Sequence, residues 1–259
     1  MADVKSKSKS KSTQSKSKLP AINGTRLELT LAAEKVFALN GIRGATQRQI
    51  REEAGQKNES VIHYHFGSQD AIIESVLHLH SKPMDQLRQD MLAKAQAESS
   101  GHLISSEQVV RCLLLPLAHY LLDRRSPGYY LRFLVQLRAD RAAWRKFSGV
   151  HDKGLRRCLS ALRDAKPYLP TAIVNQRYAN AVSLHLSGMA VLEQIISEKG
   201  AKFRSDEGWV RVEDLITTTS AMIDAPLSPA TVEAIQYSAE YQPSPSYHDV
   251  SLRRSRPEE

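Results

Sequence analysis

The sequence is poor in the residues that mark extracellular and membrane proteins. It has two cysteines, Cys112 and Cys158, in 259 residues, which are too few for a disulfide framework and are spaced for no zinc site. No apolar run approaches the roughly 18 to 20 residues that cross a bilayer, and the start of the chain lacks the apolar stretch of a signal peptide. These absences predict a cytoplasmic protein with no membrane partner.

Catalytic and metal-binding patterns are also missing. The sequence has nine histidines, but the pairs His63/His65 and His78/His80 are each two residues apart, which on a helix turns the two rings roughly 200° from one another. There is no glycine-rich phosphate loop and no motif for an activated nucleophile. The sequence therefore predicts a protein that is not an enzyme and that needs neither a cofactor nor a metal ion.

The positive charge, a net +8, is concentrated at the N-terminus. Residues 1–18 contain six lysines and one aspartate. The KSKSKSKSTQSKSK tract has nothing apolar to bury, so we expect a disordered basic arm over residues 1–24. The arm is either a solubilising tail or a flexible segment that follows nucleic-acid phosphates. If it contacts phosphates, deletion of residues 1–18 should make the affinity for DNA less sensitive to salt.

The chain beyond this arm has helical rather than strand periodicity. Residues 25–28 (Thr-Arg-Leu-Glu) and 46–49 (Thr-Gln-Arg-Gln) are capping boxes, and each should open a helix. The first helix should end at Asn40-Gly41, and Asn58 can cap a third, very short helix that ends near Gly67. Two short helices joined by a glycine-containing turn, with another helix before them, form the plan of a helix-turn-helix unit.

Longer helices follow. One begins at Ser68 and should be interrupted or bent near Pro83. Further helices are predicted over about 105–125, 127–138, 140–165, 171–199 and 209–224, with a short one at 229–239. The predicted fold class is therefore all-α. We expect four parts: the basic arm 1–24, a three-helix helix-turn-helix domain 25–80, a larger helical domain 81–226 and a mostly disordered tail 227–259.

The third predicted helix has one buried face and one polar face. When Ile62 and Phe66 are taken as buried, Tyr64 lies on the opposite side. The exposed face then comprises Lys57, Ser60, Val61, His63 and Tyr64. Such a mixture suits a helix in a major groove, where long donors reach phosphates and short side chains meet base edges. The pattern alone does not distinguish this from the solvated face of a small bundle.

The same region resembles the N-terminal signature of the TetR (tetracycline repressor) family. The resemblance covers residues 26–77 and rests on the spacing of Gly41, Ala45-Thr46, Ile50, Ala54-Gly55 and Tyr64-His65-Phe66-Gly67-Ser68. The segment AGQKNESVIHYHFGSQDAI is similar to the subset with one extra residue before the Tyr-His-Phe element. The resemblance implies that the third helix reads DNA. It also implies that Arg48 meets bases and that Thr46, Tyr64 and His65 meet phosphates. The candidate DNA contacts are Thr46, Gln47, Arg48, Lys57, Asn58, Ser60, Val61, His63, Tyr64 and His65.

Two positions depart from the pattern of that family. Gln69 stands where the family usually has a lysine, which removes one expected phosphate contact. Arg51 stands where the family usually has a small alanine, directly after the apolar Ile50. The side chain of Arg51 must therefore either extend into solvent or contact DNA.

For the C-terminal half, the resemblance implies a domain for ligand binding and dimerisation. Apolar stripes along the last two long helices either bury in their own domain or pair with a second subunit in a four-helix bundle. The candidate dimer residues are Val182, Met189, Ile196, Leu215, Thr219 and Met222. A dimer also follows from the few base pairs that one short helix can touch. The candidate ligand residues, each of which taken singly is more simply a core residue, are His119, Tyr130, Phe133, Trp144 and His185.

These features predict a ligand-responsive transcriptional repressor. It would bind a palindromic double-stranded DNA operator as a homodimer and leave it when a small-molecule inducer binds. A transcriptional activator of the same fold is an alternative, since these residues do not separate the two. A basic membrane- or nucleic-acid-associated helical protein without ligand control is a second alternative, but it leaves the Tyr-His-Phe segment unexplained.

Overall fold

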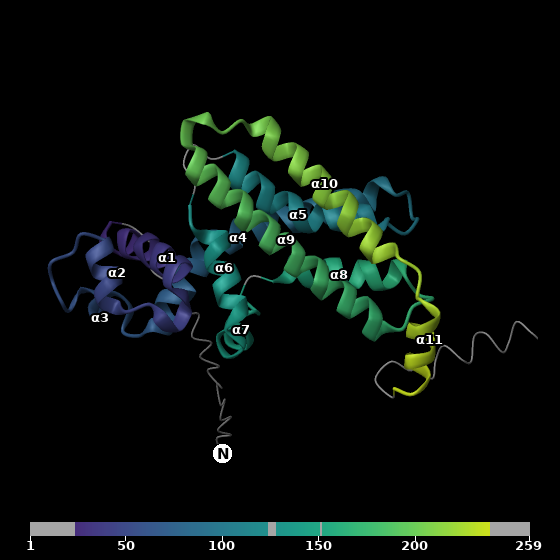
Figure 1. The fold of residues 1–259 in the computed structure, drawn as a ribbon, viewed down its shortest axis with the longest axis horizontal. Helices are drawn as coiled ribbons and strands as arrows, with labels where there is room; N and C mark the ends of the chain where they lie inside the picture. The colour runs from purple at the N-terminus through teal and green to yellow at the C-terminus, as the bar shows by residue number, and fades with distance from the viewer. Residues whose placement is uncertain (1–23, 124–127, 151, 239–259) are drawn as a thin grey trace, which may run out of the picture.

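The computed structural model describes residues 24–123, 128–150 and 152–238, which form helices and no strand (Figure 1), so the all-α prediction is confirmed. The helices are α1 (Thr25–Gly44), α2 (Gln47–Glu53), α3 (Val61–Phe66), α4 (Gln69–Glu98), α5 (Ser106–Leu122), α6 (Tyr130–Ala139), α7 (Arg141–Phe147), α8 (Lys153–Ala165), α9 (Thr171–Lys199), α10 (Ser205–Asp224) and α11 (Pro229–Gln236), with a 3₁₀ turn at Gly200–Lys202. None of these helices is long and apolar enough to cross a membrane. Nearly all of the predicted basic arm, and residues 239–259 of the predicted tail, lie outside the described residues.

Helices α1, α2 and α3 pack into a small N-terminal lobe (Figure 1), whose core is apolar. The capping box that begins at Thr46 is confirmed: its hydroxyl accepts from the N–H of Gln49, whose Oε1 accepts from the N–H of Thr46 at 2.9 Å. The capping box predicted at Thr25 is wrong. The chain turns at Gly24, which has a φ of +52°, so Thr25 already lies inside α1 and caps nothing.

Short-range signals set the boundaries of the next helices. Gly41, with a φ of +76°, breaks the helical backbone of α1 near the predicted end. Asn58 is not the cap of α3; its Oδ1 accepts the N–H of Ser60 at 2.9 Å, and α3 begins one residue after Ser60. Ser68 does cap α4, because its hydroxyl accepts a backbone N–H of the first turn at 3.2 Å. The sequence therefore placed these short helices to within about three residues.

Two predictions for the longer helices need correction. Of the two outcomes predicted at Pro83, an interruption is wrong: helix α4 continues to Glu98, because its packing against α5 and α8 offsets the one backbone hydrogen bond that proline removes. The single helix predicted over 140–165 is two helices. Asp140 caps α7 by accepting two N–H groups of its first turn, and α7 ends before a turn that contains Gly149. Helix α8 then begins the next packed segment.

The long helices α4–α10 form the helical body of the molecule (Figure 1). Helix α4 leads from the lobe into this body and packs against α5 and α8, while α1 of the lobe packs against α6. A buried polar junction marks that contact. Glu34 of α1 accepts the N–H of Tyr129 at 2.8 Å and lies 2.6 Å from Nε2 of His80 on α4. The lobe is therefore attached to the body through both apolar and specific polar contacts.

Candidate functional site

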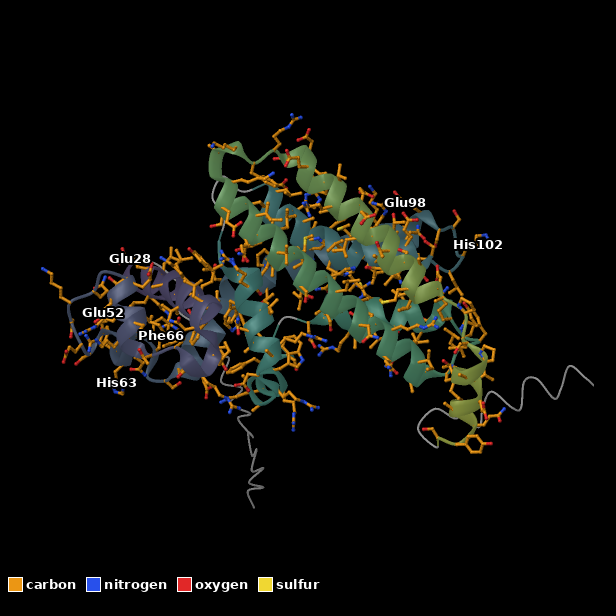
Figure 2. The ribbon with its side chains drawn as sticks, viewed as in Figure 1. Glu28, Glu52, His63, Phe66, Glu98 and His102 are labelled. Atoms are coloured by element: carbon orange, nitrogen blue, oxygen red, sulfur yellow. The ribbon has the colours of Figure 1, made fainter. Side chains whose placement is uncertain are left out.

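The most exposed large hydrophobic side chain in the described part of the lobe lies on α3. Tyr64 is 84% exposed, and His63 beside it is exposed too, whereas Ile62 and Phe66 fill the core. Figure 2 shows His63 at the edge of the lobe and Phe66 inside it. An aromatic residue with a hydroxyl and an imidazole, held outward on a short helix, can donate hydrogen bonds to phosphates or base edges. Helix α3 thus has the two faces that the sequence predicted.

Other candidate DNA contacts lie where the helical wheel did not place them. Lys57 and Ser60 are exposed but precede α3, so they belong to the turn and its first residue rather than to the helix face. Val61, predicted beside the exposed face, is only 7% exposed and packs in the core. Because α3 starts only at Val61, helical angles do not apply to residues 57–60, whereas Val61 lies about 100° from Ile62, at the edge of the buried face. The structure therefore gives Val61 no surface to offer to DNA.

The exposed end of α2 carries further predicted contacts. Thr46, Gln47 and Arg48 are exposed at its start. The Nε of Arg48 lies 2.8 Å from Glu52, and this hydrogen bond raises the pKa of the Arg48 guanidinium. Since both side chains are exposed, the ion pair is weak enough to open when a phosphate competes for the arginine.

The side chain of Arg51 pairs with two acids near the turn between α2 and α3. It lies under the turn between α2 and α3 with its side chain 16% exposed, and its guanidinium lies 3.4 Å from Glu59 and 4.0 Å from Glu52. The aliphatic stem of an arginine can cover apolar surface while its head pairs with acids. The guanidinium of Arg51 thus reaches outward to two exposed acids next to the turn before α3, as the first predicted alternative requires, and a contact with DNA stays a prediction.

Two contacts that orient α3 were not found in the sequence. Arg26 of α1 lies with its guanidinium 4.4 Å from the ring centre of Phe66 and donates to the carbonyl of His65, which is half-buried. Gln69, at the start of α4, donates from Nε2 to the carbonyl of Ile42 at 2.7 Å. Long-range pairs of this kind have no sequence signal, because they depend on where the helices meet. They fix the end of α3 against α1.

The helical body contains a cavity of about 100 Å³. Of the five candidate ligand residues, Tyr130, Trp144 and His185 line it. The other two do not. His119 is on the outer side of α5, where it pairs with Asp123 and lies 5.3 Å from the ring of Trp209. Phe133 is fully buried, but its ring packs between Phe37 and Tyr130 in the solid core.

The lining of the cavity is apolar on most sides, with a few polar groups. The apolar walls are formed by Leu77, Met84, Leu113, Leu117, Leu134, Leu137, Phe147, Val150, Leu155, Val182 and Leu186. His185 contacts Thr219 at 3.1 Å, and burial, with a smaller contribution from the charge of Arg88, lowers its pKa to about 4. His185 is therefore neutral near pH 7. Sequence reasoning missed Arg88, although its place three to four residues from the apolar Met84 and Leu92 puts a charge on the buried face of α4.

The predicted dimer stripes face the interior. Met189 and Thr219 are fully buried, Val182 lines the cavity, and the remaining three are packed against the core: Ile196, Leu215 and Met222. The outward face of α9 carries Leu184 and Val191 instead, and α10 exposes Val210. Met189 and Thr219 are thus covered by their own chain, whereas the four partly buried residues of the stripes keep some surface, and their part in a dimer stays a prediction.

Among the described residues, no group of three or more His, Cys, Asp or Glu side chains is placed to hold a metal ion. Two places in the described residues are candidates for a functional site, the exposed end of the lobe and the cavity of the body. Comparisons with known proteins bear on the first of these.

Residues 29–76 match the family model described as bacterial regulatory proteins of the tetR family. No curated protein matches the sequence. Among solved structures, the fold is similar to a crystal structure from Mesorhizobium loti assigned to the TetR-family transcriptional regulators, with 12% sequence identity, a TM-score of 0.41, and coverage of 76% of this chain and 95% of that one. The family match spans α2, α3 and most of α1, which are the elements that present Tyr64 and His63. The N-terminal lobe of this chain is therefore similar to the corresponding segment of bacterial regulatory proteins of the tetR family.

Proposed function

We propose that the protein is a repressor that binds an operator as a homodimer and releases it when a small molecule enters the cavity of the helical body. The observation that carries the proposal is the exposed face of α3, where Tyr64 is 84% exposed above a helix whose other face is core. In this proposal residues 25–80 form the DNA-binding domain and residues 81–226 the ligand-binding and dimerisation domain. Helix α4 is shared by both.

The DNA contacts proposed are the exposed members of the predicted set. They are Thr46, Gln47, Arg48, Lys57, Asn58, Ser60, His63 and Tyr64, with His65 at the end of the helix. Tyr64 and Thr46 would meet phosphates, which positions the domain on any duplex. Lys57 lies in the turn before α3 and Ser60 directly precedes the helix, close to where a recognition helix commonly contacts base edges, and the two would determine sequence preference.

A dimer is required because α3 has only six residues and can touch few base pairs. We propose the outward face of α9 and α10 as the dimer surface. Val191 is 56% exposed and Val210 is 70% exposed on adjacent helices, and Leu184 adds a third apolar group. Exposed apolar side chains that lie on neighbouring helices are typical of surfaces that a partner covers.

The cavity has a direct packing route to the lobe. Tyr130 lines the cavity, and the centre of its ring lies 4.5 Å from that of His80. His80 in turn contacts Glu34 of α1 at 2.6 Å. We propose that a ligand which displaces Tyr130 shifts α6 and α4 relative to α1, and so changes the spacing of the two recognition helices in the dimer. Such a ligand acts by binding more tightly to one of two arrangements of α4 and α6 relative to α1.

Selection of bound sequences from a random pool of DNA tests this function. The expected result is an inverted repeat whose half-sites lie about one or two helical turns apart. Enrichment of a single half-site would contradict the dimer, and no enrichment would contradict sequence-specific binding. The selected site placed over a reporter promoter then separates the two modes of regulation. Repression lowers the reporter signal, whereas the alternative, an activator of the same fold, raises it when its site lies upstream.

A further inference from the structure

The cavity of the helical body contains a buried cation that its neighbours satisfy poorly. Arg88 of α4 is 6% exposed and lines the cavity. Its Nε has no hydrogen-bond partner, and its NH2 reaches the carbonyl of Leu113 only at 3.5 Å. A guanidinium has five N–H donors, and burial without partners costs several kcal/mol. Arg88 therefore has donors to spare on a surface that faces free space.

The one buried acid beside Arg88 is engaged elsewhere. Asp85 approaches Arg88 at 3.5 Å, which is an ion pair without a close hydrogen bond. The same carboxylate accepts the N–H of Gly154 at 2.9 Å and a side-chain N–H of Gln89 at 3.0 Å. A Cβ at Gly154 would lie 2.8 Å from Asp85, so the close approach of α8 holds this carboxylate in place. Asp85 thus keeps the region neutral overall, but it and the Leu113 carbonyl hold the two terminal nitrogens of Arg88 only loosely, and Nε has no partner.

The other ionisable groups near Arg88 and the cavity include two thiols, Asp152 and His185. Burial raises the pKa of Cys112 to about 11 and that of Cys158 to about 12, so both thiols stay protonated near Arg88. Asp152 also lines the cavity; the guanidinium of Arg156 at 2.7 Å balances its charge, although its Oδ1 has no hydrogen-bond partner. His185 is neutral near pH 7 and can donate or accept a hydrogen bond. A bound anion would therefore find its donors on Arg88, whose Nε has no partner.

We propose that the cavity binds an apolar carboxylic acid, with its carboxylate on Arg88 and its hydrocarbon part against the leucine-rich walls. The inference rests on the proposed function in taking the cavity as the effector site. Arginine binds a carboxylate through two parallel N–H···O bonds, and charge-assisted bonds of this kind are about twice as strong as neutral ones. An apolar lining with one convergent charge is the usual composition of a site for a small amphipathic ligand. An alcohol of the same shape would leave Arg88 unpaired.

The test compares matched acids and alcohols on the full-length protein. The probes are hexanoate with hexan-1-ol, and phenylacetate with 2-phenylethanol, measured by isothermal titration. At least one acid should bind about tenfold or more tightly than its alcohol, which corresponds to one charge-assisted interaction. Equal or tighter binding of the alcohols would overturn the carboxylate assignment, as would no binding of either acid.

Variants locate the binding energy. Arg88→Met should remove the preference for the acid while leaving the affinity for the alcohol within about threefold. Asp85→Asn keeps an oxygen for the Gly154 N–H but removes the charge that competes for Arg88. It should increase the affinity for the acid several-fold. This second variant tests the proposal even if Arg88→Met does not fold. Arg177→Met is the control, because Arg177 donates to the Ile223 carbonyl outside the cavity. An unchanged acid affinity in Asp85→Asn would contradict the proposal.

Binding to the selected operator is measured in the same preparations. If the protein binds its operator but no acid, the ligand inference fails and the proposed regulator function stands. If it binds acids in preference to alcohols but selects no DNA sequence, the proposed function fails and the assignment of Arg88 stands. The two failures are therefore distinguishable.

Discussion

The N-terminal lobe and the helical body bury different kinds of residue. The lobe buries apolar side chains such as Phe37 and Ile50 and places most of its charges at the surface, with Glu34 at its contact with the body as the exception. The body buries Arg88, His185 and Glu193 within its helices. A buried ionisable group is unfavourable unless it is paired, so each one needs a local explanation. The difference indicates that the lobe works through its surface and the body through its interior.

The largest effect should come from removing a buried charge of the body. Glu193 of α9 is fully buried and accepts the N–H groups of Leu131 and Arg132 and the Nε of Arg132, each at 3.1 Å. Glu193→Ala leaves these donors at the start of α6 unpaired, and we expect the free energy of unfolding to fall by about 3 to 5 kcal/mol. Urea denaturation at pH 7 measures it.

The matched control is Glu53→Ala in the lobe. Glu53 forms an exposed ion pair with Lys35 at 2.6 Å, and exposed pairs contribute about 0 to 1 kcal/mol. Similar losses for the two variants would contradict the contrast between the lobe and the body.

Acid should destabilise the body through His185. Its pKa in the folded protein is about 4, below the ordinary value of 6.5, so between these values the unfolded chain binds a proton that the folded chain does not. Stability contributed by the neutral imidazole is present above pH 6.5 and is lost as the pH falls towards 4, by about 3 kcal/mol. His185→Gln should lose correspondingly less stability between pH 7 and pH 4. The control is His63→Gln at an exposed site, whose free energy of unfolding should change with pH as that of the wild type does. If His185→Gln also changes as the wild type does, His185 is not the group that destabilises the body in acid.

The outward face of α9 tests whether the body also acts through its surface. Val191→Glu places a carboxylate at the proposed dimer contact, and burying that charge in the dimer should raise the dissociation constant about 30-fold or more, or about 2 kcal/mol. Sedimentation equilibrium measures the change. Val232→Glu on α11, where Val232 is 45% exposed, is the control and should leave the assembly unchanged. A dimer that resists Val191→Glu would place its interface elsewhere.

The sequence predicted those features that depend on residues close together in the chain, and it missed those that depend on contacts between helices. The cap at Thr46, the break at Gly41 and the outward Tyr64 depend on neighbours within one or two turns, and all could be predicted. The contact of Arg26 with the end of α3 and the pairing of Arg51 with Glu59 depend on how helices meet, and neither has a local signal.

The apolar stripes of the body were also predicted only in part, because periodicity does not show what covers an apolar face. Periodicity identified Met189 and Thr219 as lying on buried faces but could not say whether a second subunit or the chain itself covers them. It also missed Arg88, since the helix was expected to break at Pro83, five residues earlier. A charge on a buried helix face is a signal for a ligand, but only once the helix is known to continue.

The surface of the lobe is tested by Tyr64→Ala. Loss of one charge-assisted hydrogen bond to a phosphate should reduce DNA affinity about tenfold, by a similar factor for all sequences. Ser60→Ala should instead change which bases are preferred. Gel-shift titration against the selected operator and a scrambled duplex measures both. Tyr237→Ala removes a tyrosine that is 83% exposed beyond α11 and should change neither affinity. An intact affinity in Tyr64→Ala would mean that α3 is turned differently on DNA.

The smallest effect is expected at Gln69, where the lobe departs from the family pattern. Its amide is directed inward to the carbonyl of Ile42 at 2.7 Å rather than outward to a phosphate. Gln69→Lys should lose about 1 kcal/mol of unfolding free energy with that hydrogen bond. If the ammonium extends outward, the slope of log affinity against log salt should steepen by about 0.9 per added phosphate contact. Gln69→Met is the control, since it loses the same hydrogen bond without gaining a charge and should leave the slope unchanged. An equal salt slope in the two variants would contradict this expectation. It would mean that the lysine, like Gln69, donates inward to the Ile42 carbonyl and does not reach a phosphate.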